Sequence, residues 1–330
     1  MSVNTQQELA TLSSAPLHGV TLNCSPDPTT ADTPYTLQVA FNNISPLSNP
    51  ERVWQLTDKG ERYESNITLD RQQHCYQLHI NCEGQGSFQL QHNQLDIDWQ
   101  ANGTGPAHYL QTLGMSLFLE LQGKLCLHAN TLVKHEQAHL FLAPSRTGKS
   151  TLTTLLTTLG YSLTTDDMAA LYHLNSSYQV YPSWPKVRLW PDSAELLEEH
   201  LTAQQVQQKK VHERFAKKEI TFTQQNNQQG GHIPTPVKAM YYLNRVDAPA
   251  NTSEPVTITP INPSAALIIL MQNSMLGDAY RGLGIEKQRI MALAALLQRV
   301  PFYRVTYPSG LNQLPDIASI LDKLIQSKTQ

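Results

Sequence analysis

Apolar and polar residues alternate along much of the first hundred residues, which is the pattern of strands with one buried face. Two segments carry apolar side chains at every second position: Tyr35, Leu37, Val39 and Phe41, then Tyr76, Leu78, Ile80 and Cys82. Two more alternate on either side of His92 and Asn93: Phe88 and Leu90, then Leu95, Ile97 and Trp99. Such a pair around a short polar turn predicts a β-hairpin. We therefore expect a small antiparallel β region, forming an accessory domain over residues 1–105.

The hydrophobic period changes at about residue 106 to the spacing of a helix. The positions that follow this spacing are Leu110, Leu113, Leu117, Phe118 and Leu121. They predict an amphipathic helix that ends at Gly123 and joins the β region to the rest of the chain. The second domain is accordingly placed at residues 106–330.

Strands and helices follow one another through the second domain. The expected strands cover residues 124–134, 138–143, 161–165 and 237–243, and the expected helices lie near 151–159, 290–297 and 317–325. Prolines punctuate residues 182–191, which predicts an irregular crossing. Residues 202–231 are rich in Gln, Asn, Lys and Gly, and we expect a mobile excursion there. Its cations are expected either to be solvated or to close over bound ligand as a flap: Lys209, Lys210, Arg214, Lys217 and Lys218.

Composition narrows the class of protein. The 330 residues are 40% hydrophobic and 15% charged, which supports a folded core and argues against disorder. The formal net charge is only −3, without a basic block, so we expect no nucleic-acid or membrane partner. The four cysteines lack metal-ligand spacing and are expected to be reduced thiols. Because no export signal opens the chain and the apolar run 265–271 is too short to span a bilayer, we expect a cytoplasmic protein.

The stretch LFLAPSRTGKST, residues 140–151, predicts a buried strand, a loop and a helix start. In phosphate-binding loops, backbone N–H groups and the positive end of a helix surround the phosphates. A lysine neutralises phosphate charge and a hydroxyl helps to hold Mg²⁺, and here Lys149 and Ser150 take these places. Ala143 stands where the first glycine of the G-x-x-x-x-G-K-[ST] pattern belongs. The expected nucleotide-binding residues are Ser145, Arg146, Thr147, Gly148, Lys149, Ser150 and Thr151.

Two adjacent carboxylates, Asp166 and Asp167, follow the short strand 161–165. Beside a nucleoside triphosphate, one carboxylate can accept the proton of an attacking hydroxyl while the other orders Mg²⁺. Adjacent strand residues face opposite ways, and Asp167 shares the parity of Tyr161, which we expect to be buried. This favours Asp166 as the base, with Ser150 and Asp167 as metal ligands. A bulge at the end of the strand would remove this distinction, and a solvated turn is the structural alternative.

From Leu127 and His128 through the loop to the two aspartates, the sequence resembles the catalytic core of the HPr serine kinase/phosphorylase family. It is most similar to the HPr-kinase-related proteins, in which the loop continues GKST and a segment such as YPSWPKVRLWPDSAELL (181–197) follows. The resemblance implies an α/β fold with a mixed-sheet P-loop kinase core akin to the nucleotide core of phosphoenolpyruvate carboxykinase. It further implies ATP, Mg²⁺, a protein or peptide hydroxyl acceptor, and active-site roles for His128, Lys149 and both aspartates.

The sequence also departs from the family. Ala143 and Arg146 replace glycines of the loop, and the glycine-rich signature downstream of the aspartates has no counterpart. HPr as the acceptor and the reverse, phosphate-dependent reaction are therefore not implied. The sequence predicts an ATP-dependent serine-type kinase that could form a homo-oligomer. Two alternatives stay open: a kinase for a small-molecule hydroxyl, and a regulator that binds nucleotide without catalysis.

Overall fold

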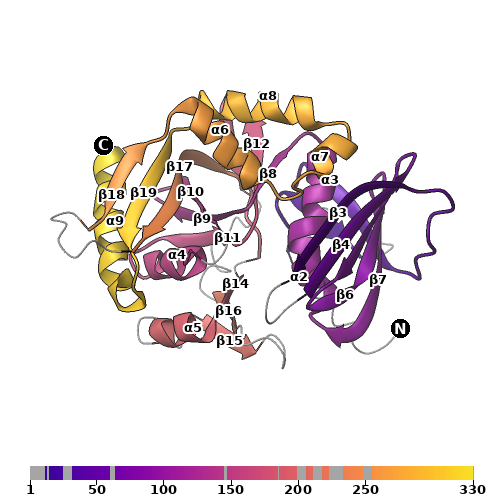
Figure 1. Cartoon of the computed structure of the whole chain (residues 1–330), viewed down its shortest axis with the longest axis horizontal. Coiled ribbons are helices and arrows are strands. Elements are labelled where there is room, and N and C mark those ends of the chain that lie inside the picture. The colour runs from indigo at the N-terminus through magenta and orange to yellow at the C-terminus, as the bar shows by residue number, and fades with distance from the viewer. Residues whose placement is uncertain are drawn as a thin grey trace. The chain divides into compact units, whose positions relative to one another are not determined.

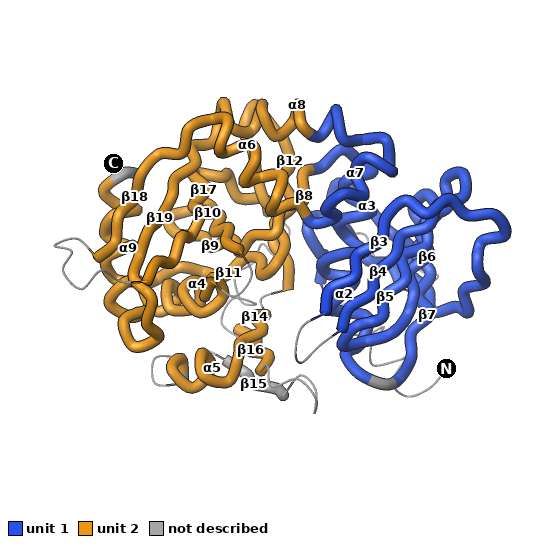
Figure 2. Tube along the Cα trace, viewed as in Figure 1, with its two compact units in different colours: residues 1–124, 275–289 blue, residues 125–274, 290–330 orange. Residues whose placement is uncertain are grey.

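The structure is a computed structural model, and it describes residues 12, 15–24, 32–59, 64–144, 147–184, 186–198, 206–210, 218–222, 233–247 and 255–329. The chain divides into two compact units (Figure 2): residues 1–124 with 275–289, and residues 125–274 with 290–330. The sequence analysis places its boundary at residue 105 instead. The two divisions differ because the helical segment after residue 105 and the later segment 275–289 both cluster with the N-terminal unit.

The first unit is built on a seven-stranded sheet. Its strands are β1 Val20–Asn23, β2 Tyr35–Phe41, β3 Glu51–Lys59, β4 Glu64–Gln72, β5 Cys75–Asn81, β6 Gly84–Gln91 and β7 Gln94–Gly103, in the order β1-β2-β7-β6-β5-β4-β3. The predicted hairpin is confirmed, because β6 and β7 pair antiparallel around His92 and Asn93. The purely antiparallel prediction is wrong at one edge, where β1, β2 and β7 pair in parallel. β2 and β7 are far apart in the chain, so local alternation could not reveal that they pair.

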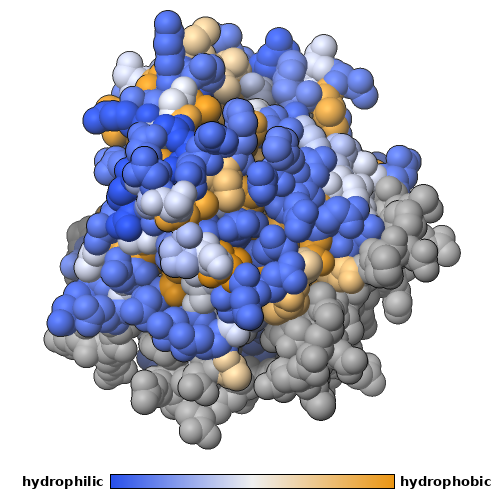
Figure 3. All heavy atoms as spheres, turned by 90° about the vertical axis from the view of Figure 1, so that its right-hand side faces the viewer, coloured by the Kyte–Doolittle hydropathy of each residue, from blue (hydrophilic) through white to orange (hydrophobic). Residues whose placement is uncertain are grey.

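One face of this sheet is polar. Where β4, β5, β6 and β7 pair, Thr68, His79, Ser87 and Asp98 lie opposite one another in register. They line part of a hollow of about 280 Å³. Figure 3, turned so that the right-hand side of Figure 1 faces the viewer, shows a mainly hydrophilic surface with scattered hydrophobic residues. The alternation predicted from sequence thus reflects a sheet with one apolar and one polar face.

The other face of the sheet is covered by a helical segment made of α2 Pro106–Tyr109, a π-helical turn at Leu110–Gly114 and α3 Met115–Leu121. Tyr35 of β2 meets Phe118 edge to face, and Trp99 of β7 packs on Tyr109. We predicted an amphipathic helix, but α3 is buried on nearly every side from Met115 to Glu120. The reason is that residues 275–289, which include α7 Ala279–Gly282, return to pack against it.

A buried ion pair fixes this returning segment. Arg289 Nε donates to both carboxylate oxygens of Glu120, at 3.0 and 3.1 Å. The hydroxyl of Tyr280 donates to the same carboxylate at 3.1 Å, and the guanidinium carbon of Arg289 lies 4.1 Å from the centre of the Tyr280 ring. Only 5% of the Arg289 side chain and 2% of the Glu120 side chain are exposed. The charges are therefore satisfied by each other rather than by water.

The second unit contains a nine-stranded mixed sheet, so the α/β class with a mixed sheet is confirmed. Its strands are β8 Leu125–Leu127, β9 Ala129–Lys134, β10 Gln137–Leu142, β11 Ser162–Thr165, β12 Ala169–Leu174, β13 Ser177–Val180, β17 Thr235–Val246, β18 Thr257–Pro260 and β19 Phe302–Pro308. The central strands β10, β17 and β19 are parallel, and the flanking pairs are antiparallel. β10 is buried on both faces, as a strand covered on both sides should be.

Helices cover both faces of this sheet (Figure 1). On one side, α4 Lys149–Thr157 and α9 Leu314–Thr329 pack in one core cluster, and on the other α6 Pro263–Gln272 and α8 Glu286–Leu297 pack in a second. Side chains from β10 enter the two clusters alternately: Phe141 joins the first, Leu140 and Leu142 the second. The apolar run 265–271 belongs to α6. No helix in the described part of the chain is long and apolar enough to cross a membrane.

A three-stranded sheet packs beside α4. It consists of β14 Lys186–Leu189, β16 Lys218–Phe222 and β15 Val206–Lys210, and α5 Pro191–Glu198 follows β14. The irregular crossing predicted for residues 182–191 is therefore wrong for its second half. Two described strands also stand inside the predicted excursion 202–231. Arg214 and Lys217 lie outside the described residues, and the flap stays a prediction.

His139 of β10 gives a pH prediction for stability. Its ring is buried and lies 6.0 Å from that of Tyr161. Burial lowers the pKa of His139 from 6.5 to about 4, and three cationic groups contribute: Lys238, Lys134 and His135. Between these pH values the unfolded chain binds the extra proton. The free energy of unfolding should therefore fall as pH decreases from 6.5 to 4, by about 1.4 kcal/mol per pH unit for this group, and be unaffected by it above that range.

Replacing His139 with Phe keeps a ring in this position and removes the titrating group. The free energy of unfolding, measured with urea between pH 4 and 7, should then change less steeply with pH. The slope should decrease by the contribution of about one proton. The exposed His74, replaced by Gln, serves as the control and should leave the slope almost unchanged. Equal slopes for wild type and His139→Phe would contradict the prediction. Burial lowers the pKa of His18 to about 4, and the charge of Lys149 followed by burial lowers the pKa of His128 to about 4, so these two residues supply part of the remaining slope.

Candidate functional site

The loop before α4 ends in a glycine with a backbone that other residues rarely adopt. Gly148 has φ +93° and caps the helix, which begins at Lys149. A Cβ at this position would meet no atom within 4 Å, so glycine is needed for the left-handed backbone rather than for space. Thr147 is tied on both sides: its N–H and hydroxyl donate to Pro144 O, and its carbonyl accepts from the Tyr307 hydroxyl at 3.1 Å. The loop is thus anchored to β19.

Two of the expected loop residues, Ser145 and Arg146, lie outside the described residues. Of the others, Ser150 is half-buried in the first turn of α4, whereas Thr151 is buried. The hydroxyl of Thr151 donates to the hydroxyl of Ser193 in α5 at 2.8 Å. The backbone N–H of Thr151 is therefore one of the donors at the N-terminus of α4, while its side chain links α4 to α5.

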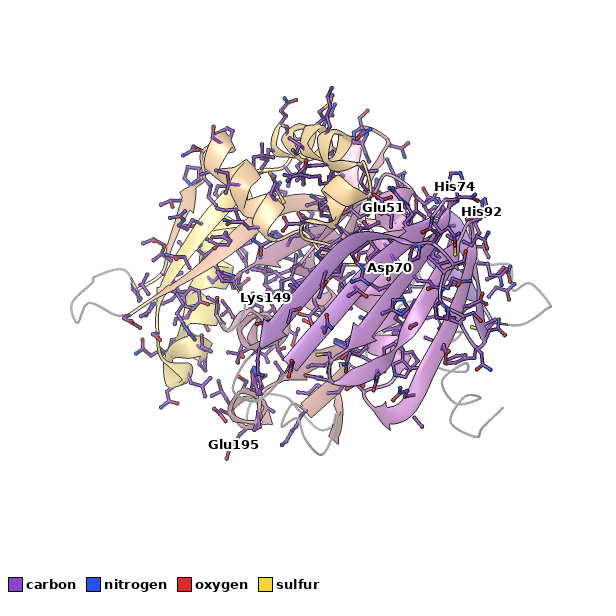
Figure 4. All side chains as sticks on the ribbon, turned by 45° about the vertical axis from the view of Figure 1, so that its right-hand side comes forward. Glu51, Asp70, His74, His92, Lys149 and Glu195 are labelled. Carbon is purple, nitrogen blue, oxygen red and sulfur yellow. The ribbon has the colours of Figure 1, made fainter. Side chains whose placement is uncertain are left out.

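Lys149, labelled in Figure 4, is buried, with only 7% of its side chain exposed. Its Nζ donates to Asn130 Oδ1 at 2.8 Å and lies 3.5 Å from Asp167 Oδ1. A buried lysine needs such partners, because an unpaired ammonium is costly to remove from water. The structure thus brings the cation of the loop to one of the two predicted carboxylates.

The two aspartates occupy a turn, not the end of a regular strand. Asp167 has a left-handed backbone with φ +62°, and Met168 N donates to Asp166 O at 2.8 Å. The pairing of β11 already shifts register between Leu163 and Thr165. Asp166 is consequently the buried member, at 5% exposed, and a third of the Asp167 side chain is exposed. The strand-parity argument predicted that Asp167 is the buried one. It is wrong because the chain leaves the extended conformation before it reaches Asp167.

His128 contacts the backbone of this turn. Its Nδ1 lies 2.9 Å from Asp167 O, where it donates as an N–H. The charge of Lys149 and then burial lower the pKa of His128 to about 4, and Asp167 only partly offsets them. The imidazole is therefore neutral near pH 7 and acts here as a hydrogen-bond donor.

Sequence reasoning missed one residue at the centre of the site, Asn130. It is fully buried in β9 and bonds to Lys149, to the N–H of Asp167 and to Thr153 of α4. The available signal was an amide inside a mainly apolar strand pattern, LHANTLV, two positions after His128. A buried amide requires several hydrogen-bond partners, which loop residues can supply.

The site can attract phosphate and can contribute oxygen ligands. A positive helix end, a left-handed glycine and a lysine favour an anion, as in phosphate-binding loops. Mg²⁺ prefers oxygen ligands and usually keeps waters and substrate phosphates in its shell. The Ser150 hydroxyl and the Asp167 carboxylate have this chemistry. Among the described residues, no group of three or more His, Cys, Asp or Glu could hold a metal ion alone.

Fold and site together define a mixed α/β protein with a glycine–lysine helix start beside an acidic turn. No family model matches the chain, and no curated protein matches it. Among solved structures it is similar to the Hpr(Ser) kinase/phosphatase from Coxiella burnetii, with 14% sequence identity over 62% of this chain and 92% of that chain, and a TM-score of 0.32. A TM-score this low carries no argument, so the function of this chain is inferred from its own residues.

Proposed function

We propose that this chain is an ATP-dependent kinase that transfers a phosphoryl group to a serine-type hydroxyl in a protein or peptide. Its nucleotide core would be akin to those of HPr kinase and phosphoenolpyruvate carboxykinase. The observation that carries the proposal is the 3.5 Å approach of Lys149 Nζ to Asp167 Oδ1 at the N-terminus of α4. The cation that would bind phosphate therefore lies beside the acidic turn, and phosphoryl transfer needs both of these groups at the nucleotide.

The nucleotide would bind at the start of α4. Gly148 lets the loop backbone turn toward the phosphates, the first N–H groups of the helix donate to them, and Lys149 neutralises their charge. Ser150 and Asp167 would hold Mg²⁺, which supplies charge stabilisation on the β- and γ-phosphates when bound. Catalysis of this reaction depends mainly on such positioning and charge, with little covalent chemistry from the protein.

The proton of the acceptor hydroxyl would pass to a carboxylate of the turn as the hydroxyl oxygen bonds to the γ-phosphorus and the bond to the leaving ADP oxygen breaks. We assign this base to Asp166, because Asp167 is already engaged by Lys149. His128 bonds to a backbone carbonyl and is neutral, so we assign it a positioning role in place of the catalytic one that the resemblance implies.

Replacing Lys149 with Met should weaken ATP binding while leaving the fold intact. The variant keeps the aliphatic stem and loses the ammonium, and charged hydrogen bonds contribute about 1.5–3 kcal/mol, or roughly 10- to 150-fold in affinity. Titration calorimetry with ATP and Mg²⁺ measures the change, and circular dichroism checks the fold. Lys287→Met, at an exposed position of α8, is the control and should bind as wild type does. Equal ATP affinity for Lys149→Met and wild type would refute the site.

A further inference from the structure

The amide of Asn130 joins three parts of the candidate site. Its Oδ1 accepts from Lys149 Nζ at 2.8 Å and from the N–H of Asp167 at 3.1 Å, and its Nδ2 donates to Thr153 Oγ1 at 2.9 Å. The side chain is fully buried in β9. One residue therefore contacts the start of α4, the second turn of α4 and the acidic turn.

The orientation of this amide follows from its partners. The hydroxyl of Thr153 donates its hydrogen to Lys149 O at 2.9 Å. Toward Asn130 this hydroxyl can therefore only accept, so the group of Asn130 that contacts it must be the NH₂ donor. The amide oxygen is then left facing two donors, an ammonium and a backbone N–H. An amide turned the other way would place N–H groups against both of them.

Asn130 also fixes the backbone of the acidic turn. Asp167 adopts a left-handed conformation, which costs energy for a residue with a Cβ. Its N–H donates to Asn130, and its carbonyl accepts from His128 at 2.9 Å. The peptide groups on both sides of the Asp167 Cα are thus fixed by hydrogen bonds, one to Asn130 of β9 and one to His128, which immediately precedes β9. Neither hydrogen bond involves the Asp167 carboxylate.

We propose that Asn130 is a positioning residue that sets the separation between the Lys149 ammonium and the acidic turn. It does so with a neutral oxygen, which orients the ammonium without cancelling its charge. The role rests on the proposed phosphoryl transfer, in which that charge must remain available for phosphate. An aspartate here could accept the same two hydrogen bonds, but it would neutralise Lys149 and could not donate to Thr153.

Three substitutions separate these effects. Asn130→Ala removes both the acceptor and the donor, and we expect kcat to fall about 10- to 100-fold, as when supporting residues of an active site are removed, with a smaller change in the KM for ATP. Asn130→Asp keeps the acceptor and adds a charge, and we expect it mainly to weaken ATP binding, by roughly tenfold or more. Thr153→Val removes the partner that orients the amide and should weaken both properties, with Thr153→Ser as the matched control that retains the hydroxyl.

Hydrogen exchange of the Asp167 amide gives a readout that needs neither ATP nor an acceptor. In wild type this N–H should be protected by Asn130, and Asn130→Ala should speed its exchange at least about tenfold without changing global unfolding. Thr153→Val reports on the same contact if Asn130→Ala does not fold. Unchanged exchange in both variants, or wild-type kcat and ATP affinity in Asn130→Ala and Asn130→Asp, would overturn the proposal. If Lys149→Met retains full ATP affinity, the proposed function fails, whatever the exchange result.

Discussion

Asp166→Asn and Asp167→Asn should each abolish phosphoryl transfer, and at least one of them should still bind ATP. Loss of a general base typically lowers a rate about 10²- to 10⁴-fold, whereas the nucleotide is held mostly by the loop and Lys149. The Asp167 backbone is held by its own N–H and carbonyl, so an amide side chain leaves the turn in place. Because the Asp167 carboxylate lies 3.5 Å from Lys149 Nζ, its replacement should also alter the dependence on Mg²⁺ and ATP.

The measurement is the rate of phosphate transfer together with the affinity for ATP, for both variants. Asp192→Asn changes an exposed carboxylate in the first turn of α5 and is the control, with a wild-type rate expected. If Asp166→Asn lowers the rate and leaves ATP and Mg²⁺ binding intact, Asp166 is the base. Wild-type transfer by both variants would show that this is no HPr-kinase-like enzyme, and a nucleotide-binding regulator would then be the better interpretation.

Removing Glu120 should cause the largest loss of stability. The variant Glu120→Ala leaves Arg289 buried, with 5% of its side chain exposed and without its carboxylate partner. Breaking a buried ion pair in this way typically costs about 3–5 kcal/mol, whereas replacing both partners by apolar residues is often nearly neutral. Denaturant unfolding should therefore show Glu120→Ala as strongly destabilised and the double variant Glu120→Leu with Arg289→Met as largely restored.

An exposed pair in the same returning segment is the matched control. Arg281 and Glu286 lie 3.3 Å apart with most of the Arg281 side chain in solvent, and such surface pairs contribute about 0–1 kcal/mol. Glu286→Gln should therefore have little effect. If Glu120→Ala were no more destabilising than Glu286→Gln, segment 275–289 would not be fixed to α3 as described.

The parts of the fold that follow from local pattern were predictable. The strands β9 and β10, the loop, α4 and β11 follow one another within a short stretch, and each has its own signal: an apolar run, a glycine–lysine step, or helical spacing. The hairpin around His92 and Asn93 is of the same kind, because its strands pair with their sequence neighbours.

Features that depend on distant parts of the chain were not predictable in this way. The helix at 115–121 has the spacing of an amphipathic helix, yet it is buried because residues 275–289 return to cover it. β14 pairs with β16, which comes some thirty residues later, so the proline-rich stretch around it gave no strand signal. In the candidate site, Asn130 was missed because its role depends on Lys149 and Asp167, whose contacts with it form only in the folded chain.

The most direct test of the central claim is transfer of labelled phosphate from γ-labelled ATP with Mg²⁺ to a host-cell lysate separated by size. Wild type is compared with the double variant Asp166→Asn, Asp167→Asn. The account predicts label in the protein or peptide fraction with wild type and none above background with the variant. Label only in the small-molecule fraction would point to a metabolite kinase. Equal labelling by both proteins, or no labelling in any fraction by wild type, would contradict the claim that this chain is a kinase acting through its acidic turn.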